Sequence, residues 1–256
     1  MNKIDVSVQL YTARKFQPYK DIFEFISSTG IKNIELFALS DFDEKELKDL
    51  LQEFGLSSMS AHISYESFEN LESIISKIKY LNIKHAIIPA PRAIPGKDFK
   101  DFFNLTENEW IDFSKDISNK IKIFSDNGLT LGYHNHSFEF DKLPSGKFPM
   151  ELILDENEKL KFEIDLGWTA AGKQNPGDWI DKYKNQIIAC HLKDFYSDND
   201  MLNHANQVSI GEGFINWREL LNKISKTPCE VIAIEHDDPK DYKDYINKSL
   251  EYLIKI

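Results

Sequence analysis

Short runs of alternating apolar and polar residues are separated along the chain by longer segments with helical spacing. The first run, DVSVQLYT at 5–12, sets Val6, Val8 and Leu10 against polar neighbours, which is the period of a β-strand. Seven more strands are predicted on this pattern, at 31–37, 56–64, 83–91, within 128–140, and at 160–168, 187–195 and 229–238.

A helical segment follows each predicted strand. The segment after Pro18 ends at Gly30, and the segment 40–55 begins with acidic residues and ends at Gly55. Acidic residues at the start and glycine at the end are typical helix boundaries. The remaining helices are predicted at 68–81, 110–127, 148–156, 176–185, within 210–226, and at 242–254.

Eight strands that alternate with eight helices predict a (β/α)8 TIM barrel, an α/β fold with a single domain over residues 1–256. A doubly wound open sheet is the alternative. Such sheets carry a glycine-rich phosphate loop after the first strand, whereas this chain has QLYTARKFQP there. The barrel is therefore the better prediction.

Composition and charge narrow the function. The chain has 42 acidic and 31 basic residues and a net charge of −11, which argues against binding to nucleic acid or to an anionic membrane. No apolar run reaches the ~18 residues of a membrane span, and MNKIDVSVQL does not read as a signal peptide. Cys190 and Cys229 lie in strand-like runs without a metal or disulfide pattern, so a cytoplasmic protein is expected.

Ionisable residues stand near the carboxyl ends of four consecutive predicted strands. In a barrel, alternate residues of each strand face the interior, and active sites lie at these ends. His134, Asp165, His191 and Glu235 all share the inward parity. Two imidazoles and two carboxylates suit one divalent metal ion, with Mn, Mg, Zn, Co and Fe all compatible. The alternative for any single residue is a hydrogen-bonded interior polar group.

Other polar residues allow two interpretations each. Tyr11, Glu35 and His62 also face inward. Each would either contact the substrate or be an interior polar group. Lys193 shares its face with His191 and would bind an oxyanion, or else form a salt bridge to Asp194 or Glu235. The remaining expectations are surface positions for His85, His204, Glu139 and Asp141, and a structural role for His236.

Five segments, YHNHSFEF, EIDLGW, CHLKD, IGEGFINW and IEHD, resemble in order and spacing the sugar phosphate isomerase/epimerase family. That family has the xylose isomerase-like barrel and is related to apurinic endonuclease IV. The resemblance covers essentially the whole chain. It implies that Asp165, His191 and Glu235 bind one divalent cation, and that Glu235 also moves a proton.

Two departures from the family pattern matter. Members of the ketose 3-epimerase type carry a glutamate where this chain has His134, so one of two carboxylate bases is missing. The endonuclease branch has a histidine at the end of the fourth strand, where this chain reads Pro89-Ala90-Pro91-Arg92. Together with the acidic charge, this makes DNA repair an unexpected function.

The resemblance implies a metal-dependent isomerase or epimerase that acts on a small sugar or sugar phosphate through an enediolate. Glu235 would abstract the proton next to a carbonyl, and His134 or Lys193 would return it. A homo-oligomer is compatible with the sequence. The expected substrate contacts are Tyr11, Glu35, His62, Arg92 (for a phosphate), His136 and Trp168.

Two other functions stay open at this stage. A lyase or hydratase for 3-keto glycosides or 3-keto sugars would acidify the same C–H bond and then expel a substituent. A barrel that binds a sugar or a partner without turnover is the third hypothesis, since the strand-five glutamate is missing.

Overall fold

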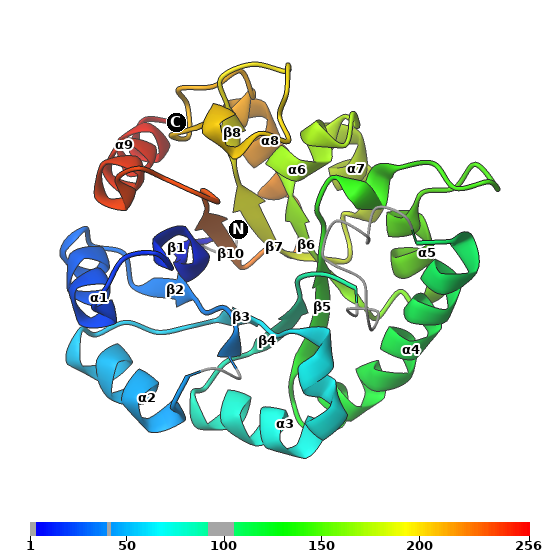
Figure 1. Ribbon diagram of the computed structural model, residues 1–256, viewed down its shortest axis with the longest axis horizontal. Helices are drawn as coiled ribbons and strands as arrows, with labels where there is room; N and C mark the ends of the chain where they lie inside the picture. Colours follow the sequence, from blue (N-terminus) through cyan, green and yellow to red (C-terminus); the bar gives the residue numbers. More distant parts are fainter. Residues whose placement is uncertain (1–3, 40–41, 92–104) are drawn as a thin grey trace.

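The computed structural model describes residues 4–39, 42–91 and 105–256. Eight parallel strands form one sheet in the order β2-β1-β10-β7-β6-β5-β4-β3, and Figure 1 shows them ringed by helices. Parallel bridges from Asn33 to Ser57 and from Leu36 to Ala61 bring the two end strands together. The predicted single-domain TIM barrel is confirmed.

The strands of the barrel are short, and helices alternate with them along the chain. The strands are β1 (Asp5–Gln9), β2 (Asn33–Glu35), β3 (Ser60–His62), β4 (His85–Ile88), β5 (Thr130–His134), β6 (Lys161–Asp165), β7 (Ile187–Leu192) and β10 (Val231–Ile234). The α-helices are α1 (Tyr19–Ser28), α2 (Glu44–Glu53), α3 (Leu71–Tyr80), α4 (Glu107–Asp126), α5 (Pro149–Glu156), α6 (Leu166–Ala171), α7 (Pro176–Tyr183), α8 (Trp217–Ile224) and α9 (Tyr242–Lys255).

Several loops contain short elements that the periodicity did not predict. They are β8 (Asp194–Phe195) paired antiparallel with β9 (Gln207–Val208), and the 3-10 helices η1 (Leu10–Ala13), η3 (Tyr65–Asn70), η5 (Phe138–Phe140) and η6 (His204–Asn206). These elements follow barrel strands and extend over the carboxyl end of the barrel.

Strand β6 ends earlier than predicted. The prediction continued it to Trp168, but helix α6 begins directly after Asp165. The Asp165 carboxylate accepts a hydrogen bond from the Trp168 backbone N–H at 2.7 Å, which caps the first turn of the helix. A side chain that was expected to act only in the cavity therefore also starts a helix.

Glycines end two helices as predicted. Gly30 and Gly55 have φ of 88° and 61°, the left-handed conformation that glycine adopts without steric cost. At the other end of α2, the Asp43 side chain accepts hydrogen bonds from the backbone N–H groups of Lys45 and Glu46. These local signals, which are readable from the sequence, set where the chain turns back toward the barrel.

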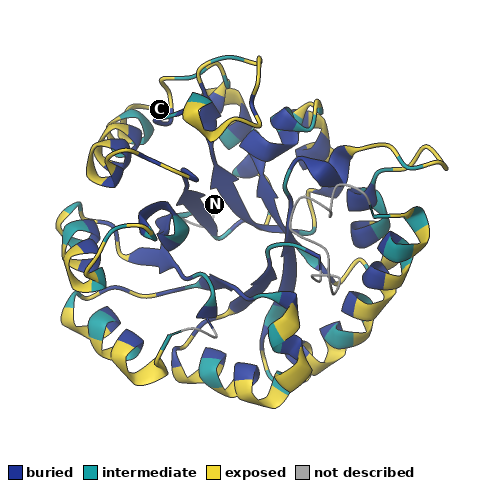
Figure 2. Ribbon diagram, in the orientation of Figure 1, coloured by how far each residue is buried: buried dark blue, intermediate teal, exposed yellow. Residues whose placement is uncertain are grey.

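The core separates into layers. Figure 2 shows buried strands and helices that are buried on the side facing the sheet. A small apolar cluster of Ile87, Ile188, Ala189 and Val231 is separate from the main core. In the strand register Val231 pairs with Ala189, two residues before His191 on β7, so this cluster lies below the polar carboxyl ends of the strands.

Two residues predicted at the surface are buried. His85 is 1% exposed because it begins strand β4, where its Nε2 lies 3.6 Å from Glu230. Glu139 is fully buried because its carboxylate accepts hydrogen bonds from the Tyr133 hydroxyl and the His136 backbone N–H, at 2.7 and 2.8 Å. Both predictions were wrong, because the position of a residue in the sequence does not report which side chains pack against it in the fold.

Asp141 and His204 are exposed, as expected, and His236 is buried. The His236 ring lies 3.2 Å from the Gln207 carbonyl through Nε2, and its backbone N–H donates to Thr12 Oγ1. No helix in the described part of the chain has the length and apolar character needed to cross a membrane.

Candidate active site

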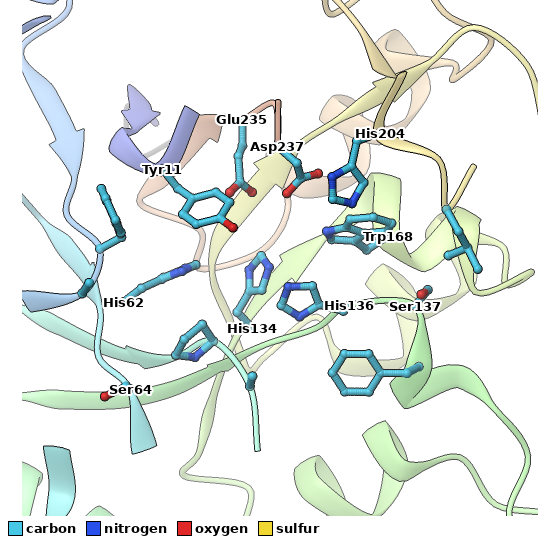
Figure 3. A pocket seen from close by; sticks show the side chains of 16 residues that line it. Tyr11, His62, Ser64, His134, His136, Ser137, Trp168, His204, Glu235 and Asp237 are labelled. Carbon is cyan, nitrogen blue, oxygen red and sulfur yellow. The ribbon is translucent and has the colours of Figure 1, made fainter. Parts of the chain in front are cut away.

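A cavity of about 380 Å³ opens at the carboxyl ends of the strands, a size that suits a small-molecule ligand. Figure 3 shows His62, His134 and His136 on one side of it, with Tyr11, Glu235, Asp237 and Trp168 around the rest. The lining residues are Tyr11, Phe37, Ala38, His62, Ser64, Pro89, Ala90, His134, His136, Ser137, Phe138, Trp168, Leu202, His204, Glu235 and Asp237.

The four residues predicted as metal ligands meet at the floor of this cavity. His134, Asp165, His191 and Glu235 come from the ends of β5, β6, β7 and β10, and one ligand atom from each lies within 4.8 Å of the others. In the strand register Asp165 pairs with His191. We call these four residues the outer group, and all of them are buried.

Two atoms of the outer group face each other without a hydrogen bond. His134 Nε2 lies 4.0 Å from Asp165 Oδ2, and this oxygen has no hydrogen-bond partner among the described residues. Burial raises the pKa of Asp165 to about 7, so its negative charge is poorly compensated. Two ligands of one ion at about 2.1 Å each lie at most about 4.2 Å apart, so a cation fits between these atoms.

Glu235 is held in its ionised form. Burial alone would raise its pKa, but Lys193 and His191 hold it well below the ordinary value. Two nitrogens lie close to Glu235 Oε2, His191 Nδ1 at 2.9 Å and Lys193 Nζ at 3.0 Å. Glu235 also lines the cavity, so it is an ionised carboxylate in contact with the space where a ligand would bind, and a group of this kind can act as a base.

Lys193 lies between the carboxylates of the floor. Its Nζ is 3.0 Å from Glu235, 3.0 Å from Asp237 and 3.6 Å from Asp165. Burial lowers its pKa, yet Asp237, Glu235 and Asp165 together raise it above the ordinary value. The salt bridge to Glu235 is one of the two that the sequence suggested, whereas Asp194 binds elsewhere.

Asp194 instead organises the IGEGFINW segment. Its carboxylate accepts hydrogen bonds from the backbone of Gly211, Gly213 and Ile215 and from Trp217 Nε1. One buried carboxylate therefore holds the loop that leads into α8. The backbone of this turn runs so close to the Asp194 carboxylate that a side chain at Gly213 would collide with it. The glycine-rich turn is therefore explained by packing against Asp194, without a role in ligand binding.

Charge counting supports a divalent cation at the outer group. The carboxylates of Asp165, Glu235 and Asp237 together carry three negative charges when ionised. Opposite them lie the ammonium of Lys193 and the His191 ring, whose pKa is lowered by burial but raised well above its ordinary value by Glu163 and Glu35. A buried excess of negative charge is costly, and a divalent ion would neutralise it. The donor set of two imidazoles and two carboxylates also fits such an ion.

A second set of residues, which we call the inner group, adjoins the outer group: Glu35 and Glu163 lie beneath it, and His62 joins them while also lining the cavity. His62 Nε2 is 2.6 Å from Glu163 Oε2, and His191 Nε2 is 2.5 Å from Glu35 Oε2. Glu35 and Glu163 are fully buried, and neither lines the cavity. Glu35 therefore lies under the floor, away from the substrate position expected for it.

Glu163 and Asp237 were not among the predicted site residues. Glu163 precedes Asp165 by two positions and shares its parity, a signal that was present in the sequence. Asp237 follows Glu235 by two positions and lines the cavity, where it pairs with Lys193. Gln207 Nε2 also donates to Asp237, and no local pattern indicates this contact because Gln207 lies on a distant loop.

The upper walls of the cavity are aromatic. The Trp168 ring lies 5.9 Å from the His136 ring, and Lys193 Nζ is 4.7 Å from the Trp168 ring centroid. The Arg14 guanidinium lies 3.6 Å from the Tyr11 ring centroid. Burial lowers the pKa of His136 to about 3, so this ring is neutral. Arg92, the expected phosphate ligand, lies outside the described residues.

Comparison with known proteins agrees with the barrel fold. The model of one protein family, the xylose isomerase-like TIM barrel, matches residues 21–256. The chain belongs to this family. The resemblance to sugar phosphate isomerases/epimerases seen in the sequence is thereby confirmed at the level of the fold family. No curated protein matches the chain.

Solved structures share the barrel at low identity. A sugar phosphate isomerase/epimerase of Parabacteroides distasonis ATCC 8503 has a TM-score of 0.77 and 20% identity, over 99% of this chain and 94% of that one. The probable 3-DHS dehydratase involved in petrobactin synthesis from Bacillus anthracis has a TM-score of 0.76 and 17% identity, over 98% and 99%. The IolI protein with a bound zinc atom has a TM-score of 0.71 and 13% identity, over 98% and 97%.

Proposed function

We propose that the protein is a metal-dependent enzyme that removes a proton next to the carbonyl of a sugar or keto-sugar, as an isomerase or epimerase. The observation that carries this proposal is Glu235, a buried and ionised carboxylate that belongs to the outer group and also lines the cavity. The similarity to proteins described as sugar phosphate isomerases/epimerases supports the substrate class.

The outer group would hold the cation. The donors would be the carboxylates of Asp165 and Glu235 and the ring nitrogens that face them, His134 Nε2 and His191 Nδ1. When bound, a divalent cation supplies Lewis-acid polarisation of the substrate carbonyl, which acidifies the neighbouring C–H bond. The IolI protein, which has the same fold, binds a zinc atom, and this supports a metal ion in the proposal.

The proton transfer uses Glu235 and Lys193. The Glu235 carboxylate takes the proton from the carbon next to the carbonyl, and the electron pair of the C–H bond becomes part of an enediolate. Lys193 is buried and does not line the cavity, but its Nζ lies 3.0 Å from Glu235 Oε2, so it can exchange a proton with Glu235, which returns the proton to carbon. His134 is the weaker choice for this second role, because its Nε2 faces Asp165 as a ligand.

Recognition would use the aromatic walls. Tyr11 and Trp168 offer ring faces to the apolar side of a sugar, and His62 and His136 offer polar edges from the same cavity. Arg92 remains the candidate for a phosphate group, as predicted from the sequence.

A 3-keto-glycoside lyase or 3-keto-sugar hydratase is the second candidate. One observation favours it: the outer group has a single carboxylate, Glu235, that reaches the cavity, while His134 occupies the place of a second base. Removal of one proton followed by loss of a substituent needs only one base on carbon. The structural similarity to a probable dehydratase is compatible with such an elimination.

Proton NMR in deuterated water tests both candidates. The protein is incubated with Mn²⁺ or Mg²⁺ and a panel of keto-sugars, sugar phosphates and 3-keto glycosides. An isomerase or epimerase incorporates deuterium at the carbon next to the carbonyl, and a lyase releases the aglycone. A protein that binds these compounds without exchange or release would be a sugar-binding barrel, and the proposal would be wrong.

Glu235→Gln provides the specific control for the base. We expect activity to fall by about 10²- to 10⁴-fold, the usual contribution of a positioned base. Glu230→Gln is the matched variant, since Glu230 lies just before the same strand and pairs with Lys84 away from the cavity. Its activity should remain that of the wild type.

A further inference from the structure

The two imidazoles of the outer group each contact a carboxylate of the inner group with one nitrogen and face a carboxylate of the outer group with the other. His134 Nδ1 lies 3.1 Å from Glu163 Oε2, while its Nε2 faces Asp165. His191 Nε2 lies 2.5 Å from Glu35 and 3.2 Å from Glu163, while its Nδ1 faces Glu235. Each ring therefore has one nitrogen on the inner group and the other toward the cavity floor.

One oxygen atom of Glu163 is common to three rings. Its Oε2 is 2.6 Å from His62 Nε2, 3.1 Å from His134 Nδ1 and 3.2 Å from His191 Nε2. A carboxylate oxygen only accepts hydrogen bonds, and a neutral imidazole carries its hydrogen on one nitrogen and a lone pair on the other. A hydrogen on His134 Nδ1 thus leaves the lone pair on Nε2, the atom that faces Asp165.

The carboxylate of Glu35, which contacts His191, is itself held by two hydrogen bonds. Gln9 Nε2 donates to Glu35 Oε2 at 2.7 Å, and the Ser60 hydroxyl donates to Oε1. Because Gln9 pairs with Glu35 in the β1–β2 register, the orientation of this carboxylate is set by the barrel itself. It can hold His191 Nε2 without moving.

We propose that Glu163, assisted by Glu35, is a positioning residue that fixes which nitrogen of His134 and His191 is presented to a cation. The ligand atoms are then His134 Nε2 and His191 Nδ1. Hydrogen bonds from a metal-binding histidine to a carboxylate behind it orient the ring and strengthen the ligand. This inference rests on the proposed cation at the outer group and extends it to residues that do not touch substrate.

The rival arrangement places the ion in the inner layer. His62, His134, Glu163 and His191 also bring ligand atoms within 4.8 Å of one another, and Glu163 Oε1 has no hydrogen-bond partner among the described residues. Each arrangement predicts a different result for the same variants, because Glu163 supports the ligands in one and is itself a ligand in the other.

The first measurement uses protein without metal. Long-range ¹H–¹⁵N correlation spectra of the histidine rings report which nitrogen carries the hydrogen. We expect His134 to be the Nδ1–H form in the wild type and a mixture of forms in Glu163→Gln, because an amide can donate to a ring nitrogen as well as accept. Glu139→Gln is the matched control, since Glu139 is equally buried but binds the Tyr133 hydroxyl and the His136 backbone.

The second measurement is calorimetric titration with Zn²⁺ or Mn²⁺ alone. Loss of such a carboxylate typically weakens metal binding 10- to 100-fold, so we expect this loss in Glu163→Gln, little change in Glu139→Gln, and loss of binding in Asp165→Asn. Glu163→Asp should recover part of the affinity. If Glu163→Gln does not fold, Glu35→Gln is used, and the metal-binding ring expected to change is then His191 and not His134.

Three results would overturn the proposal. One is binding that disappears in Glu163→Gln but persists in Asp165→Asn, which would place the ion in the inner layer. Another is wild-type affinity in Glu163→Gln, and the third is an unchanged tautomer in that variant. If the wild type binds neither ion, the cation of the proposed function fails, and the ring spectra alone decide whether Glu163 sets the tautomer.

Discussion

The floor and the mouth of the cavity are built in opposite ways. On the floor, imidazoles, carboxylates and one ammonium are almost completely buried, and the bonds between them are short and directional. At the mouth, Tyr11, Phe37, Phe138 and Trp168 present rings, and Leu202 is 58% exposed. Both regions line one cavity, so a single ligand would touch both.

The difference indicates a division of labour. Electrostatic interactions are strong on the floor because water is excluded there, and their geometry is fixed by strand ends. Apolar contacts at the mouth are less directional and adapt to several shapes. We therefore expect changes in the floor to affect stability and catalysis, and changes at the mouth to affect substrate affinity.

Lys193→Met should have the largest effect. It leaves Asp237 and Glu235 buried without their cation, a change that typically costs about 3–5 kcal/mol. Urea unfolding should show this loss, and turnover should fall as well. Lys84→Met, which removes an exposed ion pair to Glu230, should cost no more than about 1 kcal/mol. Equal losses in the two variants would contradict the distinction between the floor and the surface.

A carboxylate outside the floor should make stability depend on pH. Burial raises the pKa of Glu139 to about 8, above its ordinary value in an unfolded chain of about 4.3. The folded protein keeps the proton between these values while the unfolded chain has lost it. The free energy of unfolding therefore falls as pH rises, by about 1.4 kcal/mol per unit from pH 5 to pH 8.

Unfolding titrations at several pH values measure this contribution. In Glu139→Gln, which cannot lose a proton, the contribution of Glu139 should vanish, so the slope of stability against pH should be less negative than in the wild type. An identical slope in both proteins would show that Glu139 does not change its protonation on folding.

Removal of the metal ion should destabilise the folded protein by less than Lys193→Met does. A ligand that binds only the folded state at 100 times its dissociation constant stabilises it by about 2.7 kcal/mol. A chelator should therefore lower the melting temperature of metal-loaded wild type. In Asp165→Asn the chelator should have no effect, and an undiminished shift in that variant would place the ion away from the outer group.

Trp168→Leu should have the smallest effect on the chemistry. The variant loses the ring face toward the ligand and the cation–π contact with Lys193, and we expect KM to rise about 10-fold, or about 1.4 kcal/mol, with kcat changed less. Tyr196→Leu is the control, because Tyr196 is 76% exposed and does not line the cavity. A fall in kcat without a change in KM would show that Trp168 acts in catalysis, as expected of residues on the floor, and not in substrate binding.

Much of the fold and part of the site were predictable because they depend on short-range periodicity. Alternation of strand and helix predicted the barrel, and period two within a strand placed Asp165 and Glu235 on the inward face. The same reasoning applied to His134 and His191. Parity requires only that a residue lies in a strand, so it holds without knowledge of any neighbour.

The sequence alone determined that histidines and carboxylates would gather at the carboxyl ends of the strands. Only the tertiary structure decided that Glu163 lies behind His134 and His191, that Lys193 pairs with Asp237, and that Glu139 is buried. These facts depend on the stagger between strands and on loops that return from far along the chain. Parity gives the direction of a side chain, whereas its partner is set by the neighbouring strand.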